Sequence, residues 1–359
     1  MKIILDNIIY SNVKQGGVSN YWYELSKYLI KENRDVLFYE SIKPNFNFHR
    51  SLFEIPENKI FRDQKNYYSS IAQRLSTVKI DIKEPFVFHS SYYRTLANHK
   101  YDKKETTVHD FTHNFHSTFL KKHTHNYLKY KSIQKSAGII CISQNTYNDL
   151  MRFCPPKKNQ KVTIIHNGVS DDFFVLDEDN SKSKLPKGIE KNQYILYVGS
   201  RQKYKNFDFV LSVLNESPTL KLIIVGEQLH EKEKVIIGKN INRVEVLSHI
   251  DNITLNVLYN NALAFIYPSL YEGFGIPVIE AMKSGCPVIA HNSSSIPEVA
   301  GGAAILLNNL SISEVKKNLL KLNIASEREI IVGKGLEQSK KFSWEKCCKE
   351  TVAFYDEIF

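Results

Sequence analysis

An alternation of short apolar runs with longer amphipathic stretches constrains the fold of this chain more than any other feature of its sequence. A run of roughly four to eight apolar residues between turn residues is typical of a strand buried on both faces, and apolar residues three or four apart are typical of a helix. Strands that alternate with helices form parallel sheets covered by helices on both faces. The sequence therefore predicts the α/β class.

Each half of the chain supplies its own set of strand candidates. In the first half they are residues 2–10, 35–40, 86–91, 106–111, 138–143 and 161–167. In the second half they are residues 194–200, 220–227, 243–248, 262–269, 287–293 and 303–308. The alternation restarts in the second half, and this restart predicts two domains of similar architecture.

The domain boundaries follow from length and composition. A chain of 359 residues is longer than one hydrophobic core usually supports, since single cores stop growing near about 250–300 residues. We predict a Rossmann-like N-terminal domain over residues 1–170 and a Rossmann-like C-terminal domain over 193–340. The polar segment 171–192, rich in Asp, Ser and Lys, is predicted to be the linker. The amphipathic segment 341–359 is predicted to be a terminal helix that packs back on the N-terminal domain. Residues 46–84 are less regular, and we expect either an insertion or a helix pair facing the cleft there.

The positive charge of the chain is confined to its first half. Residues 1–170 carry 26 Lys and Arg against 14 Asp and Glu, a net charge of +12, whereas residues 171–359 carry 22 against 24, a net charge of −2. A one-sided basic domain attracts an anionic membrane surface or a polyanion, and nucleic acid is the rival partner. Residues 119–135 interleave aromatic residues with Lys and His, which suits either contact with anionic lipid or a solvated basic helix.

The sequence also bears on location. No apolar run approaches the about 20 residues that a membrane-spanning helix needs, and the first residues lack the charged start and cleavage site of a signal peptide. We expect a cytoplasmic protein that begins at Met1, with peripheral contact at the inner face of the membrane left open. The five cysteines are scattered and odd in number, which indicates neither a disulfide framework nor a zinc site.

The string YPSLYEGFGIPVIEAMKSGCPVIA, residues 267–290, carries the clearest functional signal. A strand is followed by a glycine-containing loop and by a helix with Pro277 in its first turn and Gly285 at its end. Glycines allow the backbone to approach a ligand, and the N–H groups of a helix start point toward it. The pattern predicts a cradle for a diphosphate, with Glu272 and Glu280 on opposite sides of the helix start. The alternative is a well-capped strand and helix with solvated acids.

This string strongly resembles the E-x7-E signature of the GT-B glycosyltransferases of family four, read here as EGFGIPVIE from Glu272 to Glu280. The resemblance reaches SSSIPEVAGGAAILL after the string, Gly16-Gly17, His109-Asp110, IHNGV at 165–169 and YVGSRQKYKN at 197–206. It therefore covers almost the whole chain. It implies two Rossmann-like domains that face each other across a cleft, a nucleotide diphosphate sugar as donor, and retention at the anomeric carbon.

The resemblance also implies roles for single residues. The residues expected to be catalytic are His109, Arg201, Lys205 and Glu272. The residues expected to bind the donor are Gly16, Gly17, Ser200, Arg201, Lys205, Glu272, Gly273, Phe274, Gly275, Ile276 and Glu280. Two cations at the carboxyl end of a strand would stabilise the departing diphosphate. The family places its phosphate-binding arginine at the position of Ser200, so Lys205 carries over more directly than Arg201.

The implied reaction is the transfer of a hexose to a saccharide or lipid-linked saccharide in cell-surface polysaccharide synthesis. Mannose from GDP-mannose is the working guess, and UDP- and dTDP-sugars stay open. No residue is an evident nucleophile, so the departing diphosphate oxygen is expected to help deprotonate the acceptor hydroxyl. The alternatives are a non-catalytic nucleotide-sugar-binding subunit, a nucleic-acid binder, and a sugar-nucleotide epimerase or phosphorylase of the same fold.

Two patterns bear on metal binding. His109, His113 and His116 have i, i+4 and i+7 spacing, but no cysteine or carboxylate cluster completes a ligand shell. Asp177-Glu178-Asp179 matches the Asp-x-Asp motif of Mn²⁺-dependent GT-A transferases, but it lies in the predicted linker and no strand leads into it. We therefore expect no metal, no other cofactor and no nucleic-acid partner.

Overall fold

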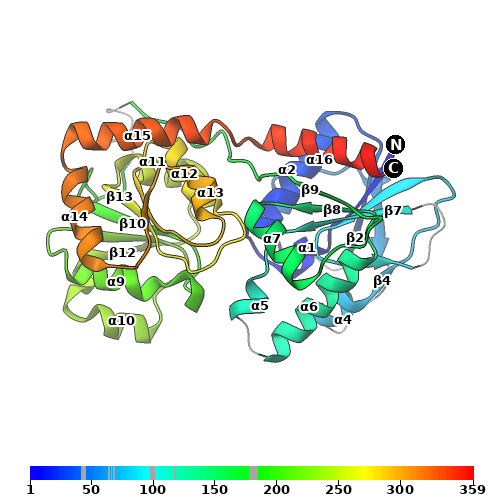
Figure 1. Cartoon of the computed structure of the whole chain (residues 1–359), viewed down its shortest axis with the longest axis horizontal. Coiled ribbons are helices and arrows are strands. Elements are labelled where there is room, and N and C mark those ends of the chain that lie inside the picture. Colours follow the sequence, from blue (N-terminus) through cyan, green and yellow to red (C-terminus); the bar gives the residue numbers. More distant parts are fainter. Residues whose placement is uncertain are drawn as a thin grey trace. The chain divides into compact units, whose positions relative to one another are not determined.

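The computed structural model describes residues 1–41, 46–63, 65, 67, 69–97, 102–116, 119–177 and 185–359, with the backbone alone at residues 119–121. The chain divides into two compact units (Figure 1). Unit 1 contains Met1–Gly168 and Trp344–Phe359, and unit 2 contains Val169–Ser343. Each unit is a parallel sheet with helices packed against it, which confirms the predicted α/β architecture.

Unit 1 is built on a seven-stranded parallel sheet with the order β3-β2-β1-β5-β7-β8-β9. Its strands are β1 (Lys2–Asp6), β2 (Val36–Ser41), β3 (Ile60–Asp63), β5 (Phe86–Ser90), β7 (Asp102–Val108), β8 (Gly138–Cys141) and β9 (Lys161–Ile164), beside a separate pair, β4 (Thr77–Val78) and β6 (Thr95–Leu96). The strand order reverses between β1 and β5. Ligands of open α/β sheets bind at the carboxyl ends of the strands next to such a switch.

The helices of unit 1 connect these strands, apart from the last helix, which follows unit 2 in sequence. They are α1 (Ile8–Asn12), α2 (Gly17–Lys31), α3 (Phe48–Ser51), α4 (Ser70–Leu75), α5 (Thr112–His116), α6 (Phe119–Gln134), α7 (Gln144–Phe153) and α16 (Trp344–Ile358), with a 3₁₀ turn η1 (Glu57–Lys59). Helix α2 buries Trp22, Leu25 and Leu29, which recur three or four residues apart and so lie on one face.

Unit 2 is built on a six-stranded parallel sheet with the order β12-β11-β10-β13-β14-β15. Its strands are β10 (Tyr194–Val198), β11 (Lys221–Val225), β12 (Val244–Leu247), β13 (Ala264–Tyr267), β14 (Val288–His291) and β15 (Ile305–Leu307). The strand order reverses between β10 and β13. The loops that follow these two strands, residues 199–206 and 268–275, therefore start side by side at the edge where a ligand is expected.

In sequence, the helices of unit 2 alternate with its strands, and the last two helices follow the last strand (Figure 1). They are α9 (Phe207–Asn215), α10 (Glu231–Ile237), α11 (Asn252–Asn261), α12 (Ile276–Lys283), α13 (Ile296–Ala300), α14 (Ile312–Leu322) and α15 (Ala325–Ser339), with 3₁₀ turns η2 (Lys203–Lys205) and η3 (Gly238–Arg243). Helix α12 has Pro277 in its first turn and is followed by Gly285 at φ +70°, as the sequence predicts.

Helix α16 returns the chain to unit 1, where it packs against α2 and β8 (Figure 1). A Cβ atom at Gly138 in β8 would lie 2.7 Å from Phe354 and 2.8 Å from Ile358, so glycine permits this close approach. The hydroxyl of Tyr355 lies 2.6 Å from Nδ1 of His89 on β5, and both side chains are buried. The last helix is thus part of the core of unit 1.

Two local predictions differ from the structure. The strand predicted over residues 2–10 ends at Asp6, because Asn7 leaves the β conformation (φ −78°, ψ 25°) and Ile8–Asn12 form α1. An apolar run can be buried as a strand or as a helix, so its composition does not distinguish these two conformations. Strand β3, inside the segment 46–84, was not predicted because Phe61 and Arg62 are exposed on an edge strand and form no apolar run.

The start of the predicted linker is attached to unit 2. Lys283 pairs with Asp171 at 2.6 Å, and the backbone N–H of Leu176 donates to the side chain of Asn260 at 2.8 Å. Residues 178–184, which include Glu178 and Asp179 of the Asp-x-Asp pattern, lie outside the described residues. All five cysteines are buried and unpaired. Of the helices that the structure describes, none combines the length and apolarity needed to cross a bilayer.

Candidate active site

The loop between β13 and α12 is held by two serines that follow β14. The backbone N–H of Glu272 donates to Oγ of Ser294 at 2.8 Å. Ser295 is fully buried, and its hydroxyl lies within hydrogen-bond distance of the carbonyls of Glu272 (3.0 Å) and Phe274 (2.8 Å). These bonds secure the loop backbone at several points, so its shape is preorganised before any ligand arrives.

Gly275 joins this loop to α12 and has a backbone conformation that favours glycine. Its φ is +108°, and a Cβ atom there would lie 2.7 Å from Cδ1 of Ile296. Helix α12 then starts at Ile276, with Pro277 in the first turn. The amino end of a helix carries partial positive charge and attracts anions. The predicted residues Gly273, Phe274, Gly275 and Ile276 thus lie together at the amino end of α12.

Lys205 and Glu272 are brought together although they are far apart in sequence. Nζ of Lys205 lies 2.6 Å from Oε1 of Glu272, and their side chains are only 17% and 11% exposed. The backbone N–H of Leu270 donates to the carbonyl of Tyr204 at 2.8 Å, which joins the two loops. Burial and then the charge of Glu272 raise the pKa of Tyr267 well above its usual range. The site thus pairs a cation and an acid beside the amino end of α12.

Arg201 is directed at other partners. Its guanidinium, 3% exposed as a side chain, lies 2.7 Å from Glu233 on α10 and donates to the carbonyls of Glu227 and Gln228. The hydroxyl of Tyr197 donates to the carbonyl of the exposed Ser200 at 2.7 Å. The two cations predicted to share a diphosphate are therefore held differently, Lys205 by Glu272 and Arg201 by the start of α10.

Glu280 projects from α12 toward α11. The hydroxyl of Tyr259 donates to its Oε2 at 3.3 Å. Burial raises the pKa of Glu280 to about 7, against an ordinary value of 4.5, and the hydrogen bond from Tyr259 opposes this shift. The carboxyl therefore changes its protonation state near neutral pH. The sequence indicated Glu280 but not Tyr259, since no motif marks that tyrosine.

His109 follows β7 in unit 1. The ring of Tyr21 meets its ring at 5.2 Å between centroids and at 77°, an edge-to-face contact. Burial lowers the pKa of His109 to about 4, so the imidazole is neutral at neutral pH. A neutral imidazole has one donor and one acceptor nitrogen, which suits contact with a sugar hydroxyl. Asp110 beside it accepts a hydrogen bond from the backbone N–H of Thr112 at 2.8 Å.

Gly16 and Gly17 begin helix α2. Gly16 is extended, with φ 161° and ψ 172°, and a Cβ atom there would meet nothing within 4 Å. Neither the packing of unit 1 nor the backbone conformation therefore requires glycine at position 16. The sequence resemblance implies that the backbone here approaches the donor, and this role of Gly16 stays a prediction.

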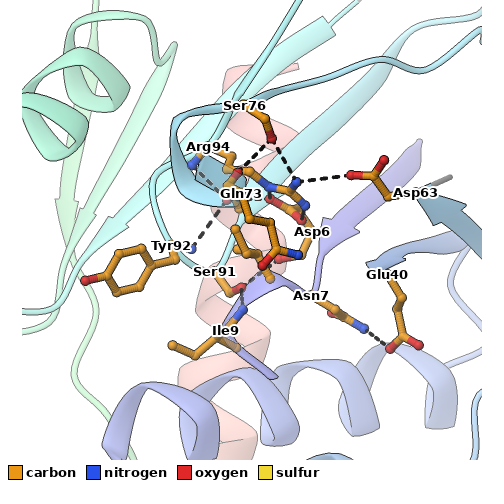
Figure 2. A network of polar contacts seen from close by, with 12 residues as sticks. Asp6, Asn7, Ile9, Glu40, Asp63, Gln73, Ser76, Ser91, Tyr92 and Arg94 are labelled. Carbon is orange, nitrogen blue, oxygen red and sulfur yellow. Dashed lines mark hydrogen bonds and ion pairs between the residues drawn. The ribbon is translucent and has the colours of Figure 1, made fainter. Parts of the chain in front are cut away.

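A buried polar network supports the carboxyl edge of the sheet in unit 1 (Figure 2). Arg94, 1% exposed, is enclosed by Asp6 at the end of β1 and by Asp63 at the end of β3. Nearby, Asn7 donates to Glu40 at the end of β2, at 2.8 Å. Sequence reasoning missed this network, since its members are separated by tens of residues and form no motif.

Metal binding has no support in the part of the chain that the structure describes. There, no three His, Cys, Asp or Glu side chains are grouped so that they could hold a metal ion. His113 and His116 lie on the short helix α5, and His109 precedes it. The described residues therefore do not supply a group of three protein ligands for a metal ion.

Comparison with known families agrees with the fold. A family model described as Glycosyltransferase Family 4 matches residues 15–173, and one described as Glycosyl transferases group 1 matches residues 178–327. Two parallel-sheet units with this loop and helix define a glycosyltransferase of the GT-B fold. The chain belongs to the glycosyltransferases of family four, as the E-x7-E string predicted.

Individual relatives extend the comparison. The sequence is 28% identical to the O-antigen chain mannosyltransferase B of Escherichia coli over 275 residues, which are 72% of this chain and 71% of the relative. The fold is similar to that of sucrose-phosphate synthase from Thermosynechococcus elongatus, with a TM-score of 0.77, 18% identity and coverage of 100% and 99% of the two chains. It is also similar to Anabaena Alr3699/HepE in complex with UDP and glucose, with a TM-score of 0.71, 16% identity and 99% coverage of both chains.

Proposed function

We propose that this glycosyltransferase moves a hexose, with mannose from GDP-mannose as the specific assignment, to a saccharide or lipid-linked saccharide during cell-surface polysaccharide synthesis. The observation that carries the proposal is the Lys205–Glu272 pair beside the amino end of α12. The similarity to an O-antigen chain mannosyltransferase supports the sugar and the pathway class. The similarity of fold to a protein that binds UDP and glucose supports a nucleotide sugar as donor.

The roles of the residues follow from their charges. The partial positive charge of the α12 start and the Lys205 ammonium stabilise the diphosphate as it departs. Glu272 exchanges its bond with Lys205 for hydroxyls of the sugar, and Glu280 accepts hydrogen bonds from the ribose. His109 contacts the sugar from unit 1. Arg201, already bound to Glu233, maintains the shape of the loop after β10.

The reaction proceeds with retention at the anomeric carbon and without a metal ion. The bond from the anomeric carbon to the diphosphate oxygen breaks, and the acceptor oxygen forms a new bond on the same face. The acceptor proton passes to the departing diphosphate oxygen, which serves as the base. No protein nucleophile takes part, and positive charge from Lys205 and α12 replaces that of a metal ion.

The basic unit 1 binds the acceptor and contacts the inner face of the membrane. Its excess of Lys and Arg attracts anionic lipid, with about 1 kcal/mol for each cation near the surface. A lipid-linked acceptor would then meet the enzyme in the cytoplasm at the membrane surface. No contact with nucleic acid is proposed.

A panel of nucleotide sugars tests the donor. GDP-mannose at one hundred times its dissociation constant should stabilise the protein by about 2.7 kcal/mol and raise the Tm, whereas UDP- and dTDP-sugars should not. Mass spectrometry of a saccharide acceptor should then show one added hexose in the presence of excess EDTA, and NMR of the product should show the anomeric configuration of the donor. Transfer that stops with the chelator would contradict the metal-independent mechanism.

Lys205→Ala tests the site in the same assay. It should lower kcat by about 10²- to 10³-fold, the usual loss when one stabilising donor to a developing negative charge is removed. Lys203→Ala is the matched control, because Lys203 is an exposed cation on the same turn. Equal rates in both variants would refute the assignment. An isomerised or cleaved donor without any acceptor would instead indicate an epimerase or a phosphorylase.

A further inference from the structure

Three helices of unit 1 contribute basic side chains to one cluster, in which two of these side chains contact a tyrosine and the third contacts the second. Arg74 of α4 lies over the ring of Tyr92, with its guanidinium carbon 4.2 Å from the ring centroid. The ring of His125 on α6 approaches Tyr92 at 5.7 Å and 80°, and the ring of His113 on α5 lies 3.9 Å from that of His125. We call Arg74, Tyr92, His113 and His125 the basic cluster. Figure 2 shows the Tyr92 ring pointing away from the Arg94 network, while the backbone N–H of Tyr92 donates to Ser90 of that network at 3.4 Å.

Two nitrogens of the basic cluster lack a hydrogen-bond partner. Nε of Arg74 and Nδ1 of His125 are buried, and neither has a partner among the described residues. A buried polar atom without a partner destabilises the folded state. The partner of such an atom is an ordered water or a bound ligand. The four side chains as a whole are partly exposed, so a ligand can approach them.

The charges around the cluster favour an anion. Arg74 has no ion pair among the described residues, and its hydrogen bond to the Tyr92 hydroxyl is long, at 3.4 Å. Asp110 is the nearby acid, and it already accepts from the backbone N–H of Thr112 and interacts with the buried Lys129. Burial, followed by the charge of Lys129, lowers the pKa of His125 to about 3. An anion beside His125 would raise the pKa of the ring again, because it favours the protonated form.

The cluster lies where a ligand of unit 1 is expected. Tyr92 follows the carboxyl end of β5, and α5 with His113 follows the carboxyl end of β7. His109, the residue expected to contact the sugar, comes directly after β7, and the charge of Lys129 acts on both His109 and His125. The basic cluster and His109 therefore share one edge of the sheet.

We propose that the basic cluster binds a phosphate group of the acceptor, carried as a phosphate or diphosphate at the reducing end of the saccharide. Nε and an Nη of Arg74 donate to two phosphate oxygens in the bidentate geometry that guanidinium and phosphate favour. The histidines and the hydroxyl of Tyr92 donate to the remaining oxygens. This site deepens the proposed function and rests on it, because it explains how a lipid-linked saccharide is told from a neutral one.

Two acceptors that share one saccharide test the proposal. One carries a short alkyl diphosphate at the reducing end, and the other is the neutral alkyl glycoside of the same length. The wild type should prefer the diphosphate by about 10- to 100-fold in kcat/KM, the range given by charged hydrogen bonds. Arg74→Gln should bring this ratio close to one and leave kcat/KM for the neutral glycoside and KM for the donor unchanged. Arg62→Gln, an exposed arginine of β3 in the same unit, should keep the full preference.

A binding measurement separates failure of this site from failure of the proposed function. Inorganic phosphate should shift the NMR signal of the His125 ring, assigned with a His125→Gln variant, in the wild type and much less in Arg74→Gln. A phosphate shift without transfer to either acceptor would uphold the site and reject the proposed function. Transfer without acceptor preference and without a phosphate shift would overturn the site alone.

Vesicles of neutral lipid with 20% anionic lipid identify the source of the phosphate. Arg74→Gln should sediment with them as the wild type does, because the proposed ligand belongs to the acceptor. If Arg74→Gln loses vesicle binding while the preference for the soluble diphosphate acceptor remains, the proposal is overturned, since the cluster would then recognise a membrane headgroup.

Discussion

At the scale of the residue, the carboxyl of Glu280 shows how burial couples protonation to binding. Its pKa is raised to about 7 by burial beside Tyr259. The ionised form accepts hydrogen bonds from ribose hydroxyls with both oxygens, and these bonds are stronger than those to the neutral acid, so donor binding should strengthen as the pH rises through 7. In the protein without donor, burying the neutral carboxyl costs less free energy than burying the carboxylate. With its proposed role in donor binding, the same group is expected to favour stability at low pH and donor binding at high pH.

Glu280→Gln should remove a pH dependence of stability. A carboxyl whose pKa is raised on folding stabilises the folded state fully below its unfolded value of about 4.5, and this contribution is lost as the pH rises through about 7. The wild type should therefore lose about 2 kcal/mol of unfolding free energy between pH 5 and 8 relative to Glu280→Gln. Denaturant unfolding of both proteins across this range measures the difference.

Other titrating groups are common to both proteins, so only the difference between the two curves is informative. Parallel stability curves would show that Glu280 titrates normally. Donor affinity supplies an independent check, because the pH dependence near 7 should disappear from the dissociation constant of Glu280→Gln while its binding becomes weaker at every pH.

Residue types alone did not separate Arg201 from Lys205. Both are cations in the loop after β10, and both were expected to face the diphosphate. In the structure, Arg201 binds the carboxylate of Glu233 on α10 and two backbone carbonyls that precede this helix. Lys205 instead binds the carboxylate of Glu272. A long side chain can reach partners that are distant in the sequence. Its position in the sequence therefore shows which loop carries it but not which residue it binds.

At the scale of the element, the unit β13–loop–α12 combines local and distant signals. Pro277 and the glycines set the helix start from within the string, and Ser294 and Ser295 hold the loop from the next connection. The serines were visible in SSSIPEV, but their bonds to the loop depend on β14 pairing beside β13. Sheet pairing brings the two connections together, and a one-dimensional pattern does not contain it.

Gly275→Ala should disturb this unit. Alanine is strained at φ +108°, and its Cβ would lie 2.7 Å from Cδ1 of Ile296. We expect a loss of about 1–3 kcal/mol in unfolding free energy and weaker donor binding, because the loop must shift to relieve the contact. Thermal unfolding and donor titration measure the two effects.

Gly333→Ala is the matched control, since Gly333 lies inside α15 and a Cβ there meets nothing within 4 Å. This variant should be neutral or up to about 1 kcal/mol more stable, because alanine favours a helix over glycine. If Gly275→Ala behaved like Gly333→Ala in both measurements, the special role of the α12 start would be lost.

At the scale of the whole molecule, one unit is built from two separate stretches of the chain. Helix α16 follows unit 2 in sequence but belongs to unit 1, where it covers β8 through the space left by Gly138. The buried hydroxyl of Tyr355 completes the bonding of His89, whose other ring nitrogen lies 2.6 Å from Glu105. Unit 1 therefore completes its core only when the end of the chain is in place.

Tyr355→Phe should weaken unit 1 selectively. The substitution leaves the buried Nδ1 of His89 without its partner, which costs about 1–3 kcal/mol. Hydrogen exchange should become faster in β5, β7 and β8, whereas β10 and β13 of unit 2 should keep their protection. Tyr127→Phe, at an exposed position of α6, should change neither sheet. Equal loss of protection in both units would contradict the assignment of α16 to unit 1.

The sequence by itself determined the α/β class, the approximate positions of the predicted strands, with the largest end shifts at β1 and β7, and the residues at the α12 start. It did so because apolar periodicity and turn residues act over short stretches of chain. The tertiary structure alone decided that Lys205 meets Glu272 and that serines after β14 hold the loop after β13. It also decided that Arg74 and His125 contact Tyr92 and that His113 contacts His125. These contacts join residues distant in sequence, and they form only when parallel strands align their carboxyl ends at one edge of a sheet.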